Sequence, residues 1–391
     1  MKIIQVCQRL YYGGGQERHV LNISKNFVKM GHEVTIVTSE IGVVPEFKSK
    51  LKLGGVRVKR IEGIKLDEPA NQVLFPGLLS FLAKQKFDVI HAHGALCQSS
   101  QFALVAAKYK KKPIIFTPHY HPWNVYDKEK IRLIRKYFEK MITVPVICNA
   151  SATIAVSDYE KELFVTKYPL IKPEKIKVIP NGVDIDFIEN SSSRRNVRKK
   201  YNIPEGKKYI LFFGATTDLR KGIHRAIEMF KIVSKRNKDA HLIILGVNTE
   251  KSIATRNLIK KFRLSDKVSP CGYVSDDEKV AFLRMSQVLV APTIYEAFGI
   301  TLAEAMYARV PVVATSCGGI PYVLKHGEHG YLVGSYKSTY AFAKYTLRLL
   351  SDEKLRKRLG NAGHKRVVSK FQWLDISKKI LALYESLVKN G

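Results

Sequence analysis

Two glutamates in the segment VLVAPTIYEAFGITLAEAMY have the residue type and the setting of a ligand site. Glu296 falls in a loop after an apolar run, and Glu304 follows eight residues later in a helix predicted to begin near Gly299. The amides of Gly299, Ile300 and Thr301 would then face a phosphate. Glu304 would accept hydrogen bonds from two sugar hydroxyls, as acidic residues do for ribose. A capped surface helix with two solvated acids is the alternative, and the spacing alone does not separate the two.

Two adjacent cations, Arg220 and Lys221, stand between the apolar run YILFF and a helix predicted over 222–236. The start of a helix already carries partial positive charge, so cations there are unfavourable unless an anion lies between them. A diphosphate suits the pair, with arginine as a bidentate donor and lysine as a point charge. Two solvated surface cations are the alternative.

A glycine run, Gly13 to Gly15, follows the first apolar run and precedes the first predicted helix. Glycine lets a backbone approach a ligand closely, and the helix start beyond offers N–H groups to an anion. The spacing is not G-x-G-x-x-G, which disfavours a dinucleotide site. A plain tight turn is the alternative interpretation.

Two histidine pairs, His91 with His93 and His119 with His121, have the i, i+2 spacing that turns side chains to one face of a strand. Four imidazoles at two strand ends would suit a transition metal. Buried, hydrogen-bonded histidines are the simpler interpretation, which we favour. The sequence analysis therefore predicts no metal site here.

Two acidic pairs also have suggestive spacing. Asp184 and Asp186 form a D-x-D pair, but one short pair lacks a full set of metal ligands. Asp158 and Glu160 stand at the start of a helix predicted over 158–167, where acids cap the helix and complement its dipole. Neither pair is predicted to bind a ligand.

The elements that must position these residues alternate between strand and helix, which predicts βαβ units and mainly parallel sheets. The polar, turn-rich stretch 188–208 indicates a linker. We therefore predict an N-terminal α/β domain over 1–187, a C-terminal α/β domain over 209–371, and a final amphipathic helix over 372–391. Doubly wound sheets of this kind bind ligands beyond the carboxyl ends of their strands, where the loops described above fall.

Composition narrows the class of protein further. The 391 residues carry a net charge of +32, and 46% are hydrophobic. This profile is typical of a globular protein and excludes collagen-like, disordered and disulfide-scaffold classes. Five scattered cysteines without a C-x-x-C pair indicate reduced thiols in the cytoplasm. No apolar run is long enough for a membrane span, and Arg9 comes too early for a signal peptide.

The densest positive charge lies in residues 108–140. Apolar residues recur there near helical spacing at Ile131, Ile134, Phe138 and Ile142, so the segment is suited to an anionic membrane surface. A surface helix with a solvated basic face is the alternative. No DNA- or RNA-binding signature accompanies the charge, so nucleic acid is not expected as a partner.

The stretch EAFGITLAEAM followed by PVVATSCGGIPYVL resembles the E-x7-E region of the family 4 retaining glycosyltransferases. Other segments resemble further motifs of that family in the same order, namely GGGQERHVLNISKNFVKMGHEVTIVT, TPHY, VSDYE, VIPNGVD, LRKG, CGYVSDDE and FQWLDISKKILALYESL. The resemblance spans nearly the whole chain. It implies the GT-B fold, in which two Rossmann-like domains face a cleft and the last helix crosses back to the first domain.

The resemblance also implies a UDP- or GDP-linked hexose donor, held mainly by the C-terminal domain, and a glycan, lipid-linked or other hydroxyl acceptor, held mainly by the N-terminal domain. In catalytic roles it places His119 and Glu296 beside the transferred sugar, and Arg220 and Lys221 on the diphosphate. It assigns donor binding to Gly14, Gly15, Tyr273, Val274, Gly299, Ile300, Thr301 and Glu304.

Retention in this family is described without an enzyme nucleophile, because the leaving diphosphate takes the acceptor proton on the face of attack. This chemistry needs electrostatic stabilisation and implies neither a metal nor a cofactor. Gly214 is followed by Ala215 where many members have arginine, so one diphosphate contact of the family is either missing or supplied by Arg220, and Lys221 is the better supported of the two cations. We expect a cytoplasmic enzyme, peripheral on the membrane where 108–140 binds lipid. A catalytically inactive sugar-nucleotide sensor and a GT-B phosphorylase or epimerase are the alternatives.

Overall fold

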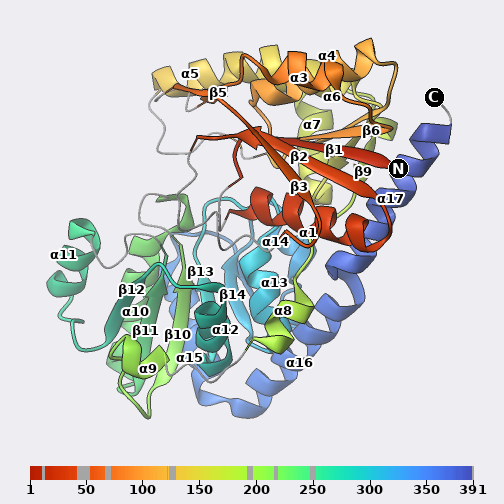
Figure 1. Cartoon of the computed structure of the whole chain (residues 1–391). Helices are drawn as coiled ribbons and strands as arrows, with labels where there is room; N and C mark the ends of the chain where they lie inside the picture. The colour runs from red at the N-terminus through yellow and green to blue at the C-terminus, as the bar shows by residue number, and fades with distance from the viewer. Residues whose placement is uncertain are drawn as a thin grey trace. The chain divides into compact units, whose positions relative to one another are not determined.

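The computed structural model describes residues 1–10, 14–41, 53–66, 72–120, 122, 129–191, 197–214, 219–246 and 252–389. The chain forms two compact units, Met1–Gly182 with Trp373–Gly391, and Val183–Gln372. Each unit is built around a parallel sheet covered by helices (Figure 1), which confirms the predicted α/β fold class. In the described part of the chain, no helix combines the length and the apolar composition needed to cross a membrane.

The first unit contains a seven-stranded sheet in the order β3-β2-β1-β6-β7-β8-β9. Its strands are all parallel, and the order reverses between β1 and β6, where the ends Cys7 and His93 pair. Ligands of doubly wound sheets bind at such a reversal. The strands are β1 (Lys2–Cys7), β2 (Glu33–Ser39), β3 (Arg57–Ile61), β6 (Val89–His93), β7 (Ile114–Thr117), β8 (Ala152–Ala155) and β9 (Ile176–Val178), beside an antiparallel pair β4 (Ile64–Leu66) and β5 (Gln72–Leu74).

Helices of the first unit include the last helix of the chain, α17, whose Tyr384 is buried against the sheet. The predicted return of this helix to the N-terminal domain is therefore confirmed. The helical segments are α1 (Gly15–Lys29), α3 (Leu78–Lys84), α4 (Gln98–Tyr109), α5 (Glu129–Phe138), the π-helical turn η1 (Glu139–Thr143), α6 (Val144–Asn149), α7 (Asp158–Lys167), the 3₁₀ turn η2 (Pro173–Lys175) and α17 (Trp373–Lys389).

The second unit contains a six-stranded parallel sheet in the order β12-β11-β10-β13-β14-β15. Its order reverses between β10 and β13, and Pro270 lies in β12, an edge strand, where a missing N–H is tolerated. The strands are β10 (Lys208–Phe213), β11 (Ala240–Leu245), β12 (Val268–Gly272), β13 (Val288–Ala291), β14 (Val312–Thr315) and β15 (Gly330–Val333).

Two short helices of the second unit fall within or next to the stretch that we expected to be a linker. Arg284 donates hydrogen bonds to the carbonyls of Ile188 and Ser191, which joins this stretch to the rest of the unit. The helical segments are α8 (Ile185–Asn190), α9 (Val197–Lys200), the 3₁₀ turn η3 (Leu219–Lys221), α10 (Ile223–Arg236), α11 (Ile253–Lys261), α12 (Asp276–Met285), α13 (Ile300–Tyr307), α14 (Ile320–Val323), α15 (Thr339–Ser351) and α16 (Glu353–Lys370).

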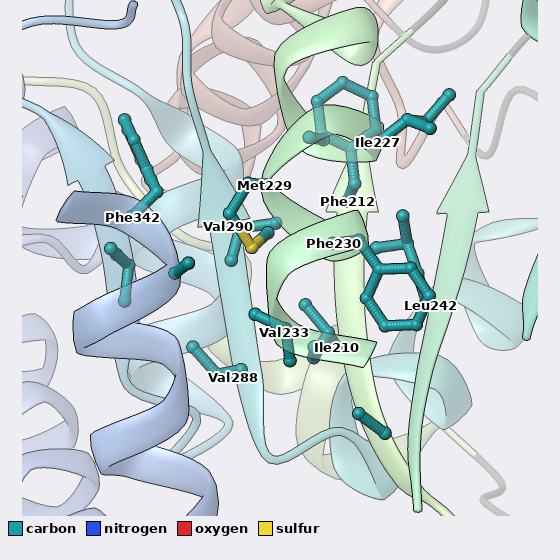
Figure 2. Packing of buried hydrophobic residues seen from close by; sticks show 14 of the residues in the cluster. Ile210, Phe212, Ile227, Met229, Phe230, Val233, Leu242, Val288, Val290 and Phe342 are labelled. Carbon is teal, nitrogen blue, oxygen red and sulfur yellow. The ribbon is translucent and has the colours of Figure 1, made fainter. Parts of the chain in front are cut away.

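The core of the second unit forms where α10 and α15 cover one face of its sheet (Figure 2). Ile227, Phe230 and Val233 recur at helical spacing along α10 and are fully buried with the side chains of β10, β11 and β13. Because helices cover both faces of such a sheet, its central strands are continuous apolar runs. This packing fixes the ends of β10 and β13, from which the candidate site is built.

Candidate functional site

An ion pair between Lys221 and Glu296 joins two loops of the second unit at the carboxyl ends of β10 and β13. Lys221 ends the 3₁₀ turn η3, and Glu296 lies between β13 and α13. The two side chains are 27% and 12% exposed, so water screens the pair only in part. The two strands are neighbours in the sheet, which explains how residues far apart in sequence meet here.

Backbone contacts hold these two loops together. The carbonyl of Arg220 accepts hydrogen bonds from the Ile294 amide at 2.8 Å and from the Thr293 hydroxyl at 3.0 Å. Burial raises the pKa of the Cys317 thiol to about 12; the charge of Glu296 adds to this shift, and Lys221 and Arg220 oppose it. Arg220, Lys221 and Glu296 therefore lie in one small region at the carboxyl ends of β10 and β13.

Gly222 is required where the two loops touch. Its φ is +76°, and a Cβ there would lie 2.0 Å from the carbonyl oxygen of Pro292. Gly206 has a similar φ of +70°, but no described atom lies within 4 Å of its Cβ position. We expect Gly206→Ala to cost about 1–2 kcal/mol of folding free energy through backbone strain. Gly222→Ala should cost about 1–3 kcal/mol more, the cost of overpacking.

Urea unfolding of the two glycine variants measures this difference directly. Equal losses would contradict the close approach of the two loops. A larger loss for Gly222→Ala, with an unchanged m-value, would support it.

The helix after Glu296 begins at a glycine in the left-handed region. Gly299 has a φ of +93°, and no described side chain caps α13 there. Uncapped first-turn amides, such as those of Ile300 and Thr301, are the groups with which a helix start binds anions. The Gly319 amide donates to the carbonyl of Glu296 at 2.8 Å, so the glycine pair after β14 supports the Glu296 loop.

Glu304 pairs with a lysine that the sequence analysis did not select. Lys279 Nζ lies 2.7 Å from Glu304 Oε1, and the two side chains are only 6% and 8% exposed. Lys279 is also 3.6 Å from Asp276 at the start of α12. In the sequence, the only sign that Lys279 would be buried is its position directly before the apolar run VAFL. The second glutamate of the motif therefore faces a buried cation.

The two other predicted donor contacts follow directly after β12. Tyr273 is exposed and Val274 is buried. Gly272, the last residue of β12, has a φ of +74°. Ser275 then caps α12 in a capping box with Glu278.

In the first unit, the predicted glycine loop leads directly into α1. Gly14 precedes the helix and Gly15 is its first residue, whereas Gly13 lies outside the described residues. Glu17 lies in the first turn of α1 and is buried. Burial raises its pKa to about 7, although a hydrogen bond from its own backbone amide and the charges of Arg9 and Arg18 lower it in part. The sequence analysis did not single out this buried acid.

The raised pKa of Glu17 predicts a pH-dependent stability. The folded protein binds a proton there more tightly than the unfolded chain, so this residue's stabilising effect falls as pH rises from about 4.5 to about 7. We expect the stability of Glu17→Gln relative to wild type to rise by about 1.4 kcal/mol per pH unit in that window. Urea unfolding at pH 5, 6, 7 and 8 measures this. A constant difference across the four pH values would contradict it.

Four histidines gather at the ends of β6 and β7 and on α1. His91 Nδ1 lies 2.6 Å from the Tyr384 hydroxyl, and its Nε2 lies 2.7 Å from the Thr117 hydroxyl. His93 Nε2 lies 2.6 Å from Gln5 Oε1. Burial lowers the pKa of His91 and His93 well below the ordinary value, so both are neutral near pH 7. His121 lies outside the described residues, as does Ala215 in the second unit.

His119 occupies the loop after β7 in a strained conformation, with a φ of +46°. The Tyr120 amide next to it donates to Glu160 Oε1 at 2.7 Å, and the Val156 amide donates to Glu160 Oε2 at 2.6 Å. Burial raises the pKa of Glu160 to about 7. Ser157 caps α7, while Glu160, which we interpreted as a complement to the helix dipole, is a buried bridge that positions the His119 loop.

The D-x-D pair has a local structural role. Asp184 caps α8 by accepting a hydrogen bond from the Phe187 amide at 3.1 Å.

Comparison with known proteins identifies the class. A glycosyltransferase from Rickettsia africae has a TM-score of 0.80 at 21% identity, covering 100% of this chain and 99% of its own. The Anabaena protein HepE, solved with UDP and glucose, has a TM-score of 0.80 at 19% identity, covering 99% and 100%. Both show the same fold, that of the GT-B glycosyltransferases.

The sequence narrows this class to a family. Residues 13–187 match "Glycosyltransferase Family 4", and residues 193–366 match "Glycosyl transferases group 1". An uncharacterized glycosyltransferase of Methanocaldococcus jannaschii is 28% identical, covering 95% of this chain and 94% of its own. A phosphatidyl-myo-inositol mannosyltransferase of Mycobacterium leprae is 26% identical, covering 100% and 98%. The chain belongs to the family 4 glycosyltransferases.

Proposed function

We propose that this glycosyltransferase retains the anomeric configuration and moves a hexose from a UDP- or GDP-linked donor to a glycan, lipid-linked or other hydroxyl acceptor without a metal ion. The observation that carries the proposal is the Lys221–Glu296 pair, held with Arg220 at the reversal of the second sheet. Cations and helix amides are what a departing nucleoside diphosphate needs. The structure of HepE with UDP-glucose supports this class of donor.

In this mechanism the donor rearranges the ion pair. The diphosphate takes Lys221 as its counter-ion, which leaves Glu296 to accept a hydrogen bond from the transferred sugar. Glu304 accepts hydrogen bonds from the ribose hydroxyls, and Lys279 orients its carboxylate within a buried site. The acceptor hydroxyl attacks the sugar carbon as the bond to the diphosphate breaks. The leaving phosphate oxygen takes the hydroxyl proton on the same face, so the configuration is retained.

Thermal melting with millimolar UDP, GDP, ADP and dTDP tests the donor site. A ligand at one hundred times its Kd stabilises the folded state by about 2.7 kcal/mol, a shift of several degrees. We expect UDP or GDP to raise the Tm, and Glu304→Gln to lose this shift when compared with its own ligand-free Tm. If no nucleotide raises the Tm, the donor site is not formed as proposed. Nucleotide binding without turnover would favour the inactive-sensor alternative.

A turnover assay with the matching sugar nucleotide then tests the chemistry. EDTA should leave the rate unchanged, and the product should keep the anomeric configuration of the donor. An inverted product would refute the proposed mechanism. Dependence on added phosphate would favour a phosphorylase.

A peripheral contact with an anionic membrane is the second part of this proposal, and it uses a different face from the one we predicted. Ile142 is buried and Ile131, Ile134 and Phe138 are partly buried, so these residues pack inward. Three others form an exposed apolar stripe at a spacing of four, Leu133, Tyr137 and Met141, which are 59%, 62% and 52% exposed. Exposed basic residues run parallel to it, namely Arg132, Lys136 and Lys140. Such a stripe suits an interfacial helix.

Liposome sedimentation at low salt tests this surface. Reversing the charge of Arg132, Lys136 and Lys140 should abolish binding to vesicles that contain anionic lipid, because each basic residue near the surface contributes about 1 kcal/mol. The matched control reverses three basic residues of α16, Lys354, Lys357 and Arg358, which are also exposed. Equal loss in both triple variants would indicate a nonspecific charge effect, and no binding by the wild type would refute the membrane contact.

A further inference from the structure

We propose that His19, His93 and His119 of the first unit form a binding site for a transition-metal cation of the zinc class. One ligand nitrogen from each ring lies within 4.8 Å of the other two. His19 and His93 are fully buried, and His119 is partly buried, which gives the site one route to solvent. The three residues come from α1, from the end of β6 and from the loop after β7.

The hydrogen bond on the outer side of His19 leaves a lone pair facing inward. His19 Nδ1 lies 2.7 Å from Asn181 Oδ1, an acceptor, so the ring proton is on Nδ1. Its Nε2 therefore carries a lone pair, and no described residue or backbone group supplies a partner for this buried atom. A buried polar atom without a hydrogen-bond partner costs folding free energy. We therefore infer that a ligand from outside the protein supplies the partner of this nitrogen.

His93 is oriented in the same way. Its Nε2 donates to Gln5 Oε1 at 2.6 Å, so Nδ1 carries the lone pair. That Nδ1 lies 3.4 Å from His119 Nε2. Two nitrogens on one tetrahedral zinc ion, each about 2.0–2.1 Å from the metal, are about 3.3 Å apart, so this pair is already at ligand spacing. His119 binds through Nε2 once its ring proton is on the other nitrogen.

The partners of His19 and His93 match the outer contacts of metal-binding histidines. Such a histidine donates its second ring N–H to a carbonyl or carboxylate oxygen, which fixes the tautomer and the ring orientation. Asn181 and Gln5 supply these oxygens here. Neighbouring His91 differs, because both of its nitrogens are bonded, to Tyr384 and to Thr117. His91 is thus excluded as a ligand and serves as a control.

The chemistry of the donor set selects the metal. Three neutral imidazoles suit Zn²⁺, Co²⁺, Ni²⁺ or Cu²⁺ and not Mg²⁺ or Ca²⁺, which prefer oxygen ligands. A fourth position remains for water. This expectation rests on the proposed function: bound zinc should inhibit sugar transfer, because the metal would hold the ring of His119, which the family resemblance places beside the transferred sugar. Turnover itself stays independent of metal.

The test uses the full chain stripped of metal with EDTA and titrated with Zn²⁺ against a chromophoric chelator, and separately with Co²⁺. We expect one zinc per chain and the visible absorption of a four-coordinate cobalt ion. His19→Gln and His119→Gln should remove both signals. Gln5→Leu should weaken zinc binding by about 10–100-fold, the cost typical of losing an outer contact. His91→Gln should bind zinc as the wild type does.

The variants separate the possible outcomes. Circular dichroism shows whether His19→Gln folds. If it does not fold, His119→Gln still tests the site, because it changes a loop residue. Wild-type protein that binds no stoichiometric zinc would overturn the inference, as would His119→Gln binding zinc with wild-type affinity. Sugar transfer by the metal-free protein together with no zinc binding would overturn only the metal site. Zinc binding by a protein that transfers no sugar even when it is metal-free would overturn only the proposed function.

Discussion

Replacing Lys221 by alanine is expected to lower kcat by about 10²–10³-fold, equivalent to about 2.7–4 kcal/mol, the effect of removing one preorganised donor from a transition state. The largest change in charge during the reaction is on the departing diphosphate. Lys221 is positioned for it by the backbone contacts of η3 with the loop after β13 and by its ion pair with Glu296. Because the charge develops as the bond breaks, kcat should fall more than KM rises.

Steady-state kinetics of Lys221→Ala and Arg225→Ala test this expectation. Arg225 lies on α10, four residues along the chain, and pairs with Glu228 at 2.7 Å, with side chains 27% and 32% exposed. The variant Arg225→Ala removes a cation whose side chain is as exposed as that of Lys221, from the same region of the second unit. Because Arg225 has no role in the proposed mechanism, kcat should change by less than about twofold, in line with the small effects of solvent-accessible ion pairs. An unchanged kcat in Lys221→Ala would remove this lysine from the proposed role.

Replacing Lys279 by methionine is expected to cost about 3–5 kcal/mol of folding free energy at pH 7, because it leaves the Glu304 carboxylate buried without its counter-ion. Urea unfolding at pH 7 measures this loss.

An exposed pair of equal length provides the control. Lys357 and Glu353 are also 2.7 Å apart, but their side chains are 73% and 62% exposed. Lys357→Met should cost far less folding free energy than Lys279→Met, because water screens an exposed pair. The double variant Lys279→Met with Glu304→Leu should regain most of the stability lost in the single variant, since the buried Glu304 charge is removed together with its partner. A loss below about 1 kcal/mol in Lys279→Met would contradict a strongly coupled buried pair.

Much of the fold and part of the site follow from local patterns in the sequence. The apolar runs that became β1, β6, β10 and β11 are buried on both faces, and such runs are readable because parallel strands need no polar alternation. The loops after them were identifiable because ligand sites of doubly wound sheets lie at strand ends. Lys221 and Glu296 could thus be assigned to one site without knowing their contact.

Other features depend on contacts between distant segments, which local patterns do not encode. Nothing near Lys279 specifies Glu304 as its partner, and α5 has two apolar stripes whose exposure is set by what each packs against. His19 was missed since it lies in α1, far in sequence from the strand-end histidines. Local sequence determined the elements and the loops that carry the chemistry. The tertiary structure decided which charges and imidazoles are buried together, because burial and pairing arise only when separate βαβ units pack into one domain.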